Sequence, residues 1–229
     1  MPLRGVVFDF DGVIADTEPL HLGAYQDVLT DTALSLDAKD YYERYLGYDD
    51  MGVFTALSRD QGVALDARDV RRLVQAKGRR FKDRVRGANV LFPDAAACIE
   101  QLAAHVPLGI ASGALHDEIE AILTTTRLWQ HFKVIVAADD VPQSKPAPDS
   151  YQRAVRLLGG RGTSPDPSGY VAVEDSVWGI RAARAAGLRC VALTSSYPAE
   201  ALASADLVLS GLGELELSQL EQLCSQLDG

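Results

Sequence analysis

The sequence has very few cysteines. Its 229 residues contain only three, Cys98, Cys190 and Cys224, which are widely spaced and form no CxxC pair. An odd and scattered set of cysteines argues against a disulfide framework and against a zinc site, and favours a reduced, intracellular protein. Each cysteine falls in an apolar helix or strand pattern, as expected of a small core residue.

Long apolar runs are also missing. No stretch approaches the roughly twenty apolar residues of a membrane span. The start, Met-Pro-Leu-Arg, lacks the apolar core of a signal peptide. We therefore expect a cytoplasmic protein without a membrane partner.

An excess of positive charge is absent too. The formal net charge of −10 argues against nucleic acid or an anionic membrane as the main partner. Residues 17–88 contain twelve Lys/Arg and twelve Asp/Glu, so the whole negative excess lies in the rest of the chain. This difference in charge supports treating residues 17–88 as a separate unit.

The pattern of apolar residues divides the chain in the same way. Residues 17–88 have a helical pattern, which Gly47–Gly52 and Gln61-Gly62 break into three or four helices. From residue 93 onward, predicted strands alternate with predicted helices. Such alternation predicts an α/β fold, a Rossmann-like parallel sheet with helices on both faces. We expect residues 1–16 and 89–229 to form this core, and residues 17–88 to form an inserted all-α cap.

The most informative segment is FDFDG, which follows the apolar run 5–7. Because strand side chains alternate between faces, Asp9 and Asp11 are expected on one face, with Phe8 and Phe10 on the other. Burying two neighbouring carboxylates costs several kcal/mol unless a cation or a donor compensates them. The segment therefore indicates a site of chemistry.

Other polar groups follow later predicted strands. Ser112-Gly113 and Glu174-Asp175 each end a strand, and Lys145 lies in the loop after another. Singly, the serine and the acidic pair are typical of helix caps, and a loop lysine is typically a solvated charge. The carboxyl ends of parallel strands share one edge of a sheet, so together these groups predict a site.

The combination suits phosphoryl transfer. Asp9, Asp175 and a backbone carbonyl would bind Mg²⁺. Ser112 and the amide of Gly113, which are expected to open a helix, would bind phosphate together with Lys145. Asp9 could then attack phosphorus and form an aspartyl-phosphate, while Asp11 moves the proton of the leaving oxygen and later of water.

The segments FDFDGVIADTEP, IASGA, SKPAPD and VAVEDSVWGIRAARAAG resemble, in order and spacing, the haloacid dehalogenase-like superfamily. The resemblance is to its branch of phosphatases and β-phosphoglucomutase with a helical cap. It implies Asp9 as the nucleophile and Asp11 as the acid/base. It implies Mg²⁺ on Asp9, the Asp11 carbonyl and Asp175, with Glu174 close by or reaching through water.

The resemblance also implies that Ser112 and Lys145 hold the transferring phosphate. The dehalogenases that give the family its name lack the second aspartate and need no metal. The presence of Asp11 and Asp175 therefore argues against dehalogenation.

Two residues of the predicted cap are candidates for contact with substrate. Lys77 falls on an apolar helical stripe with Val70, Leu73 and Phe81, where it either reaches into the cleft or extends to water. His21 resembles a histidine found in β-phosphoglucomutase and related phosphatases, although a structural histidine is an alternative.

The segment Gly47-Tyr48-Asp49-Asp50 departs from the sugar-phosphate mutases. These mutases carry basic residues there that hold a second, distal phosphate. Two acids in this place should repel such a phosphate, so the segment favours hydrolysis of a monophosphate.

Together these features predict a Mg²⁺-dependent phosphatase of a small phosphorylated metabolite, monomeric by default. A hexose-phosphate mutase is the alternative enzyme, and a catalytically silent binding protein is the alternative class. The substrate stays open among a sugar phosphate, phosphoglycolate and a nucleotide.

Overall fold

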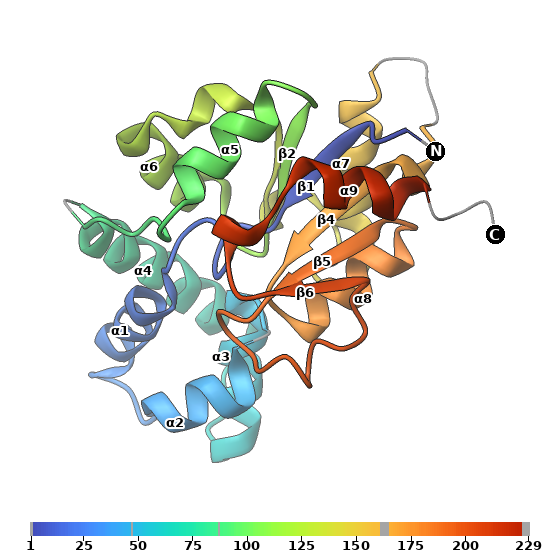
Figure 1. Cartoon of the computed structure of the whole chain (residues 1–229). Coiled ribbons are helices and arrows are strands. Elements are labelled where there is room, and N and C mark those ends of the chain that lie inside the picture. The colour runs from blue at the N-terminus through green and yellow to red at the C-terminus, as the bar shows by residue number, and fades with distance from the viewer. Residues whose placement is uncertain (1, 47, 87, 161–164, 226–229) are drawn as a thin grey trace. The chain divides into compact units, whose positions relative to one another are not determined.

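The computed structural model describes residues 2–46, 48–86, 88–160 and 165–225 (Figure 1). It divides the chain into two compact units. One consists of Met1–Asp16 with Leu91–Gly229, and the other is Thr17–Val90. Gly47, which begins the segment predicted to break the cap helices, lies outside the described residues.

A parallel sheet forms the centre of the larger unit. Within the described residues it has six strands in the order β3-β2-β1-β4-β5-β6, and every neighbouring pair is parallel (Figure 1). The strands are β1 (Gly5–Phe8), β2 (Leu108–Ala111), β3 (Phe132–Val136), β4 (Tyr170–Glu174), β5 (Arg189–Leu193) and β6 (Leu207–Leu209).

Helices cover both faces of the sheet, as expected for a parallel sheet. They are α5 (Ala95–Ala103), α6 (His116–Thr126), α7 (Asp149–Leu158), α8 (Val177–Ala185) and α9 (Leu217–Ser225). Side chains of α7 and α8 pack into one core cluster with Val7 and Ala172 of the central strands. Figure 1 shows α9 crossing in front of the strands, on the other face. The predicted α/β class is therefore confirmed.

The strand order reverses between β1 and β4. The chain proceeds from β1 to β2 and β3 on one side, and from β4 to β5 and β6 on the other. In open α/β sheets a ligand binds in the crevice outside the carboxyl ends of the strands at such a point. Residues that directly follow β1 and β4 are therefore in position to form a site.

The smaller unit is helical within its described residues. It contains α1 (Glu18–Leu29), the short α2 (Ala38–Asp40) with a π-helical turn Tyr41–Tyr45, α3 (Asp50–Gln61) and α4 (Ala67–Val85). Aspartate side chains cap three of these helices, at Asp37, Asp49 and Asp66. Its own apolar core includes Tyr25, Phe54 and Leu57.

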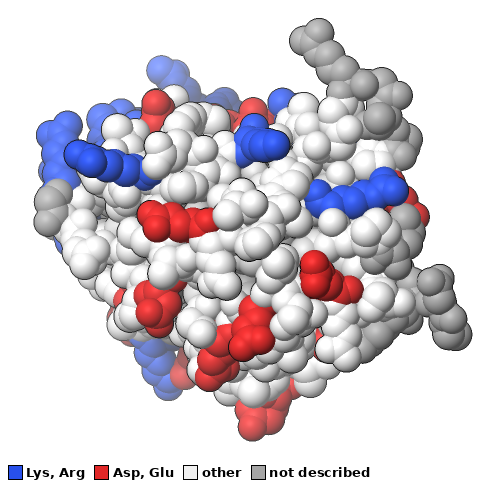
Figure 2. Space-filling view, turned by 45° about the horizontal axis from the view of Figure 1, so that its top comes forward, with Lys and Arg blue, Asp and Glu red and all other residues white. Residues whose placement is uncertain are grey.

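On the face shown in Figure 2, most lysine and arginine side chains lie toward the upper left, whereas the acidic ones are spread more widely. Figure 2 shows acidic side chains separated by uncharged atoms, so the described part of that face has no continuous acidic patch. Among the described residues, no helix is both long enough and apolar enough to cross a bilayer.

Candidate active site

Asp9 lies immediately after the central strand β1. Its backbone N–H donates a hydrogen bond to the carbonyl of Val173 in β4 (2.8 Å), which continues the pairing of the two strands by one residue. Its carboxylate is buried and accepts a hydrogen bond from the N–H of Phe10 (2.7 Å). The sheet therefore fixes the position of this carboxylate.

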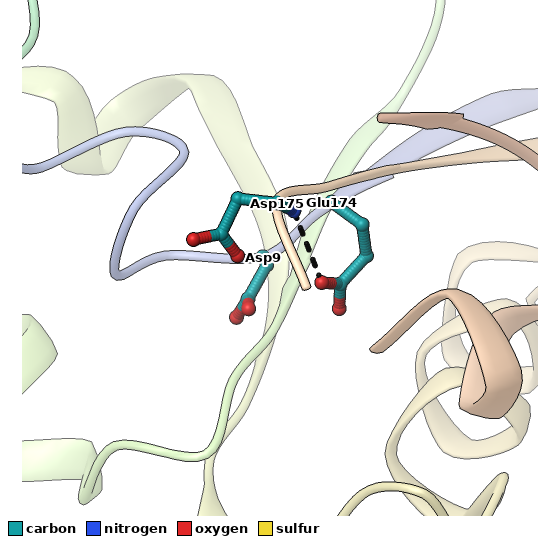
Figure 3. A group of neighbouring side chains, drawn as sticks. All are labelled: Asp9, Glu174 and Asp175. Carbon is teal, nitrogen blue, oxygen red and sulfur yellow. Dashed lines mark hydrogen bonds between the residues drawn. The ribbon is translucent and has the colours of Figure 1, made fainter. Parts of the chain in front are cut away.

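Glu174 and Asp175 come from the end of the neighbouring strand β4. Oxygen atoms of Asp9, Glu174 and Asp175 lie within 4.8 Å of one another, and all three residues are buried. Figure 3 shows the three carboxylates converging at the ends of their strands. The predicted convergence of acids from β1 and β4 is thus observed.

Lys145 reaches this group from the loop between β3 and α7. Its Nζ lies 2.9 Å from Asp9 Oδ2 and 2.6 Å from Glu174 Oε1. The side chain is only 10% exposed, so it is not the solvated loop charge that a lone lysine would suggest. Lys145 therefore links the acid after β1 to the acid that ends β4.

The pKa values of Asp9 and Lys145 are shifted by burial and by their charged neighbours. Burial raises the pKa of Asp9 to about 7, with Glu174 and Asp11 adding to the rise and Lys145 opposing it. Burial alone would lower the pKa of Lys145, but attraction to Asp9 and Glu174 outweighs it and raises that pKa. Lys145 is therefore held in its charged form beside Asp9 and Glu174.

The site fits a divalent cation. Three buried carboxylates lie within 4.8 Å of one another, and the ammonium of Lys145 contacts two of them, so carboxylates outnumber ammonium groups in this cluster. Buried charges of this kind are costly unless they are paired or coordinate a metal. Mg²⁺ prefers oxygen ligands and is bound through one or two carboxylates together with water and substrate phosphate, so the donor set suits it.

Glu174 has both carboxylate oxygens engaged by donors. Oε1 accepts from Lys145 Nζ (2.6 Å) and from the hydroxyl of Tyr151 (2.7 Å). Oε2 accepts from the N–H of Asp175 (3.2 Å) and from the N–H and Oγ of Ser176 (3.4 and 3.1 Å). A carboxylate offers about four lone-pair positions, so these are fully used. Glu174 consequently serves to hold Lys145.

Asp11 lies in the turn that follows Asp9. Strand β1 ends at Phe8, so the alternation of faces expected for residues 8–11 does not apply to this stretch. Phe10 is buried and its carbonyl accepts from the N–H groups of Val13, Ile14 and Ala15. Asp11 is half-buried, and its carboxylate lies outside the group of three acids.

Ser112 and Gly113 do not open a helix, contrary to expectation. They were expected to open a helix, but α6 begins at His116, and Leu115 occupies its N-cap position. The buried Ser112 Oγ instead accepts a hydrogen bond from the N–H of Ala114 (3.0 Å). Both residues thus lie in a turn after β2, and the dipole of α6 does not start at Gly113.

His21 and Lys77 lie together inside the helical unit. Lys77 is fully buried, which excludes the alternative that its ammonium extends to water. Its Nζ lies 2.6 Å from His21 Nδ1 and 2.9 Å from Asp50 Oδ1. The ring of His21 stacks on Phe81, with 4.1 Å between centroids.

The acids Asp49 and Asp50 were expected to repel a second phosphate, but each has an internal role. Asp49 caps α3 by accepting from the N–H of Gly52 (2.7 Å). Asp50 accepts from the hydroxyl of Tyr25 (2.6 Å) and pairs with Lys77. Because Lys77 neutralises Asp50, this segment gives much less repulsion than the sequence indicated.

Two glycines allow the carboxylates their close packing. A Cβ on Gly179 of α8 would lie 1.8 Å from the carboxylate of Glu174. A Cβ on Gly12 would lie 1.9 Å from Asp175 Oδ2, and Gly12 has a φ of +75° that favours glycine. Neither position has space for a larger residue unless the acid moves.

The substitution Gly179→Ala is therefore expected to lower the free energy of unfolding by about 3 kcal/mol, as overpacking does. A loss of stability would be informative, because replacing glycine with alanine inside a helix otherwise raises the free energy of unfolding by up to about 1 kcal/mol. Urea denaturation measures the change. Gly211→Ala is the control, because a Cβ there meets nothing within 4 Å. A Gly179→Ala variant as stable as the parent would show that Glu174 is not held in place.

The sequence did not reveal three residues that position the acids. Tyr151 and Ser176 donate to Glu174, and Ser196 donates through Oγ to Asp175 Oδ2. Ser196 could have been found, because it follows β5 at the same edge of the sheet. Tyr151 gave no such signal, since an aromatic residue on an amphipathic helix is typical of a core.

The sequence is similar to several known proteins, and these matches agree on one family. Residues 6–193 match the family model described as haloacid dehalogenase-like hydrolase. Protein CbbY of Rhodobacter capsulatus is 34% identical over 206 residues, which cover 86% of this chain and 88% of that protein. Validoxylamine A 7'-phosphate phosphatase of Streptomyces hygroscopicus subsp. limoneus is 41% identical over 110 residues, or 48% of this chain and 49% of that one.

A solved structure agrees with these matches. It is a CbbY mutant from Rhodobacter sphaeroides in complex with xylulose-(1,5)bisphosphate, with a TM-score of 0.84 and 29% identity. The alignment covers 96% of this chain and 99% of that one. The chain belongs to the haloacid dehalogenase-like hydrolases.

Proposed function

We propose that the chain is a Mg²⁺-dependent phosphatase that releases orthophosphate from a small sugar phosphate or a similar ester. The observation that carries this proposal is the buried group Asp9, Glu174, Asp175 and Lys145 at the reversal of strand order. Excess negative charge in this group calls for a cation. A cation and Lys145 together provide a place for a phosphate dianion beside Asp9.

In the proposed reaction, a carboxylate oxygen of Asp9 attacks phosphorus and the ester P–O bond breaks. Asp11 protonates the leaving alcohol oxygen. Asp11 then takes a proton from the water that attacks the aspartyl-phosphate, and orthophosphate and free Asp9 result. General acid–base help of this kind is typically worth about 10²–10⁴ in rate.

Other residues are proposed to bind the ground and transition states. Bound Mg²⁺, held by Asp9 and Asp175 with the Asp11 carbonyl, would neutralise charge on the phosphate oxygens. Lys145 contributes a second positive charge, and Ser112 with the amide of Gly113 would donate hydrogen bonds to phosphate.

The helical unit is proposed to act as a cap that opens for exchange of substrate and product and closes for the reaction. Its boundaries in this proposal are residues 17–88. His21 and Lys77 are its candidates for interaction with the leaving group. The fully buried Lys77 already carries a partner in Asp50, so its part would be to orient His21.

The neutralised Asp50 keeps sugar bisphosphates among the candidate substrates, since it removes the main objection to a second phosphate. The relatives support this choice. One is named for a phosphate ester, and the CbbY structure contains a ketose bisphosphate. The same observation keeps the hexose-phosphate mutase as the second candidate function.

A substrate panel tests the proposal. Purified protein with Mg²⁺ is incubated with ketose bisphosphates, hexose and pentose monophosphates, phosphoglycolate and nucleoside monophosphates, and free orthophosphate is followed. We expect release from one or more sugar esters, and none with the Asp9→Asn variant. An isomerised sugar phosphate without released orthophosphate would contradict hydrolysis and support the mutase.

Metal binding is expected to depend on pH. The pKa of Asp9 is raised to about 7, so below neutral pH a proton competes with Mg²⁺ for this carboxylate. Excess Mg²⁺ should therefore raise the thermal unfolding midpoint more at pH 8 than at pH 6, measured against EDTA. Equal increases at both pH values would show that Asp9 does not take part in binding the metal.

A further inference from the structure

Tyr151 contacts an acid of the site through its hydroxyl. It lies in the first turn of α7 and is fully buried in the core that α7 and α8 share with the sheet. Its hydroxyl donates to Glu174 Oε1 at 2.7 Å. A buried hydroxyl placed on a charged acceptor forms a stronger hydrogen bond than one between neutral groups.

The same oxygen of Glu174 also holds Lys145. Lys145 Nζ lies 2.6 Å from Oε1, and 5.1 Å from the centre of the Tyr151 ring. An ammonium within about 6 Å of an aromatic ring is attracted to its face. Tyr151 therefore touches the Lys145–Glu174 pair twice, through its hydroxyl and through its ring.

This arrangement limits where the ammonium can go. Oε1 has two lone pairs, of which Tyr151 takes one and Lys145 the other. Because Tyr151 takes one of these lone pairs, Lys145 has only the other and cannot move fully onto Glu174. It is left shared with Asp9, whose Oδ2 lies 2.9 Å from Nζ.

We propose that Tyr151 is a positioning residue that keeps Lys145 directed towards Asp9 and the phosphate by sharing Glu174 Oε1 with it. This inference rests on the proposed phosphatase function for its meaning in catalysis. The positioning of Lys145 should change the affinity for phosphate, which can be measured without turnover. Without the Tyr151 hydroxyl, Lys145 would be drawn towards Glu174 and would interact more weakly with a bound phosphate.

The variant Tyr151→Phe tests this claim, since it keeps the ring and removes only the hydroxyl. The dissociation constant for orthophosphate is measured by titration calorimetry in the presence of Mg²⁺. We expect this dissociation constant to rise about tenfold. Weakening the contact between Lys145 and phosphate should cost about as much as losing one hydrogen bond to a charged group. With an active substrate, KM should rise in parallel.

Tyr170→Phe is the matched control. Tyr170 is also a buried tyrosine, but it begins β4 while Glu174 ends that strand. Four residues of strand separate the two by about 13 Å. The control should leave the dissociation constant of orthophosphate unchanged.

The outcomes separate this inference from the proposed function. A tenfold loss of orthophosphate affinity in Tyr151→Phe alone supports the inference, whether or not the parent hydrolyses a given ester. An unchanged affinity overturns it, even if the thermal midpoint of the variant falls, because Tyr151 would then only stabilise the core. Failure of the parent to hydrolyse any ester in the panel bears on the proposed function alone.

Discussion

Replacing Asp9 with asparagine is expected to slow phosphate release by at least about 10⁴-fold, as the loss of a nucleophile does in other enzymes. Asparagine has nearly the same shape but cannot form the acyl-phosphate. The backbone N–H of Asp9, which bonds to Val173, is retained, so the connection between β1 and β4 should persist. Circular dichroism checks the fold, and an orthophosphate assay checks the rate. Activity at the parent level would remove Asp9 from the mechanism.

The same substitution has a signed effect on stability. Burial raises the pKa of Asp9 to about 7 in the folded protein, from an ordinary value of 3.8. The folded state therefore binds this proton more tightly than the unfolded chain. The resulting stabilisation is fully present below about pH 4 and is lost as the pH rises through about 7.

Asparagine has no proton to lose in this range. In EDTA, the thermal midpoint of Asp9→Asn minus that of the parent should therefore be larger at pH 8 than at pH 5. A difference that becomes smaller as the pH rises would mean that Asp9 is stabilised as an anion in the metal-free protein.

The second large effect is expected at Lys145. Lys145→Met keeps an unbranched side chain but leaves Asp9 and Glu174 buried without their shared cation. Removing one partner of a buried ion pair costs about 3–5 kcal/mol. Phosphate release should fall about 10²–10³-fold, as when one group that stabilises developing charge is lost. Denaturation in urea at pH 8 with EDTA measures the stability.

Two further variants make this prediction specific. Adding Glu174→Gln to Lys145→Met removes one of the two carboxylates left without their cation, so it should restore part of the stability but not the activity. Arg189→Met breaks the more exposed Arg189–Asp206 pair and should cost at most about 1 kcal/mol. If Lys145→Met cost no more than this control, the Lys145 pair would not be acting as a buried one.

The sequence predicted the acidic centre of the site because strand ends obey a simple rule. FDFDG and the Glu174-Asp175 pair each follow an apolar run, and parallel strands bring their carboxyl ends to one edge. The observed separation of at most 4.8 Å between their oxygens agrees with that rule. Residue identity and position along the strand were sufficient here.

The features that the sequence did not predict depend on tertiary contacts. Tyr151 looks like any core aromatic until Glu174 is placed beside it. The hydrogen bond from the N–H of Ala114 to Ser112 Oγ, which forms the turn after β2, is not revealed by spacing alone. Lys77 sits on an apolar stripe in either alternative, and only the three-dimensional structure shows that it is buried beside Asp50.

One measurement tests the central claim most directly. A ³¹P nuclear magnetic resonance time course of the best sugar ester with Mg²⁺ follows substrate, isomerised sugar phosphate and orthophosphate in one sample. The phosphatase account predicts that the orthophosphate signal grows as the ester signal falls, and that Asp9→Asn abolishes this growth. Exchange between two sugar phosphate signals without orthophosphate, or undiminished release by Asp9→Asn, would contradict it.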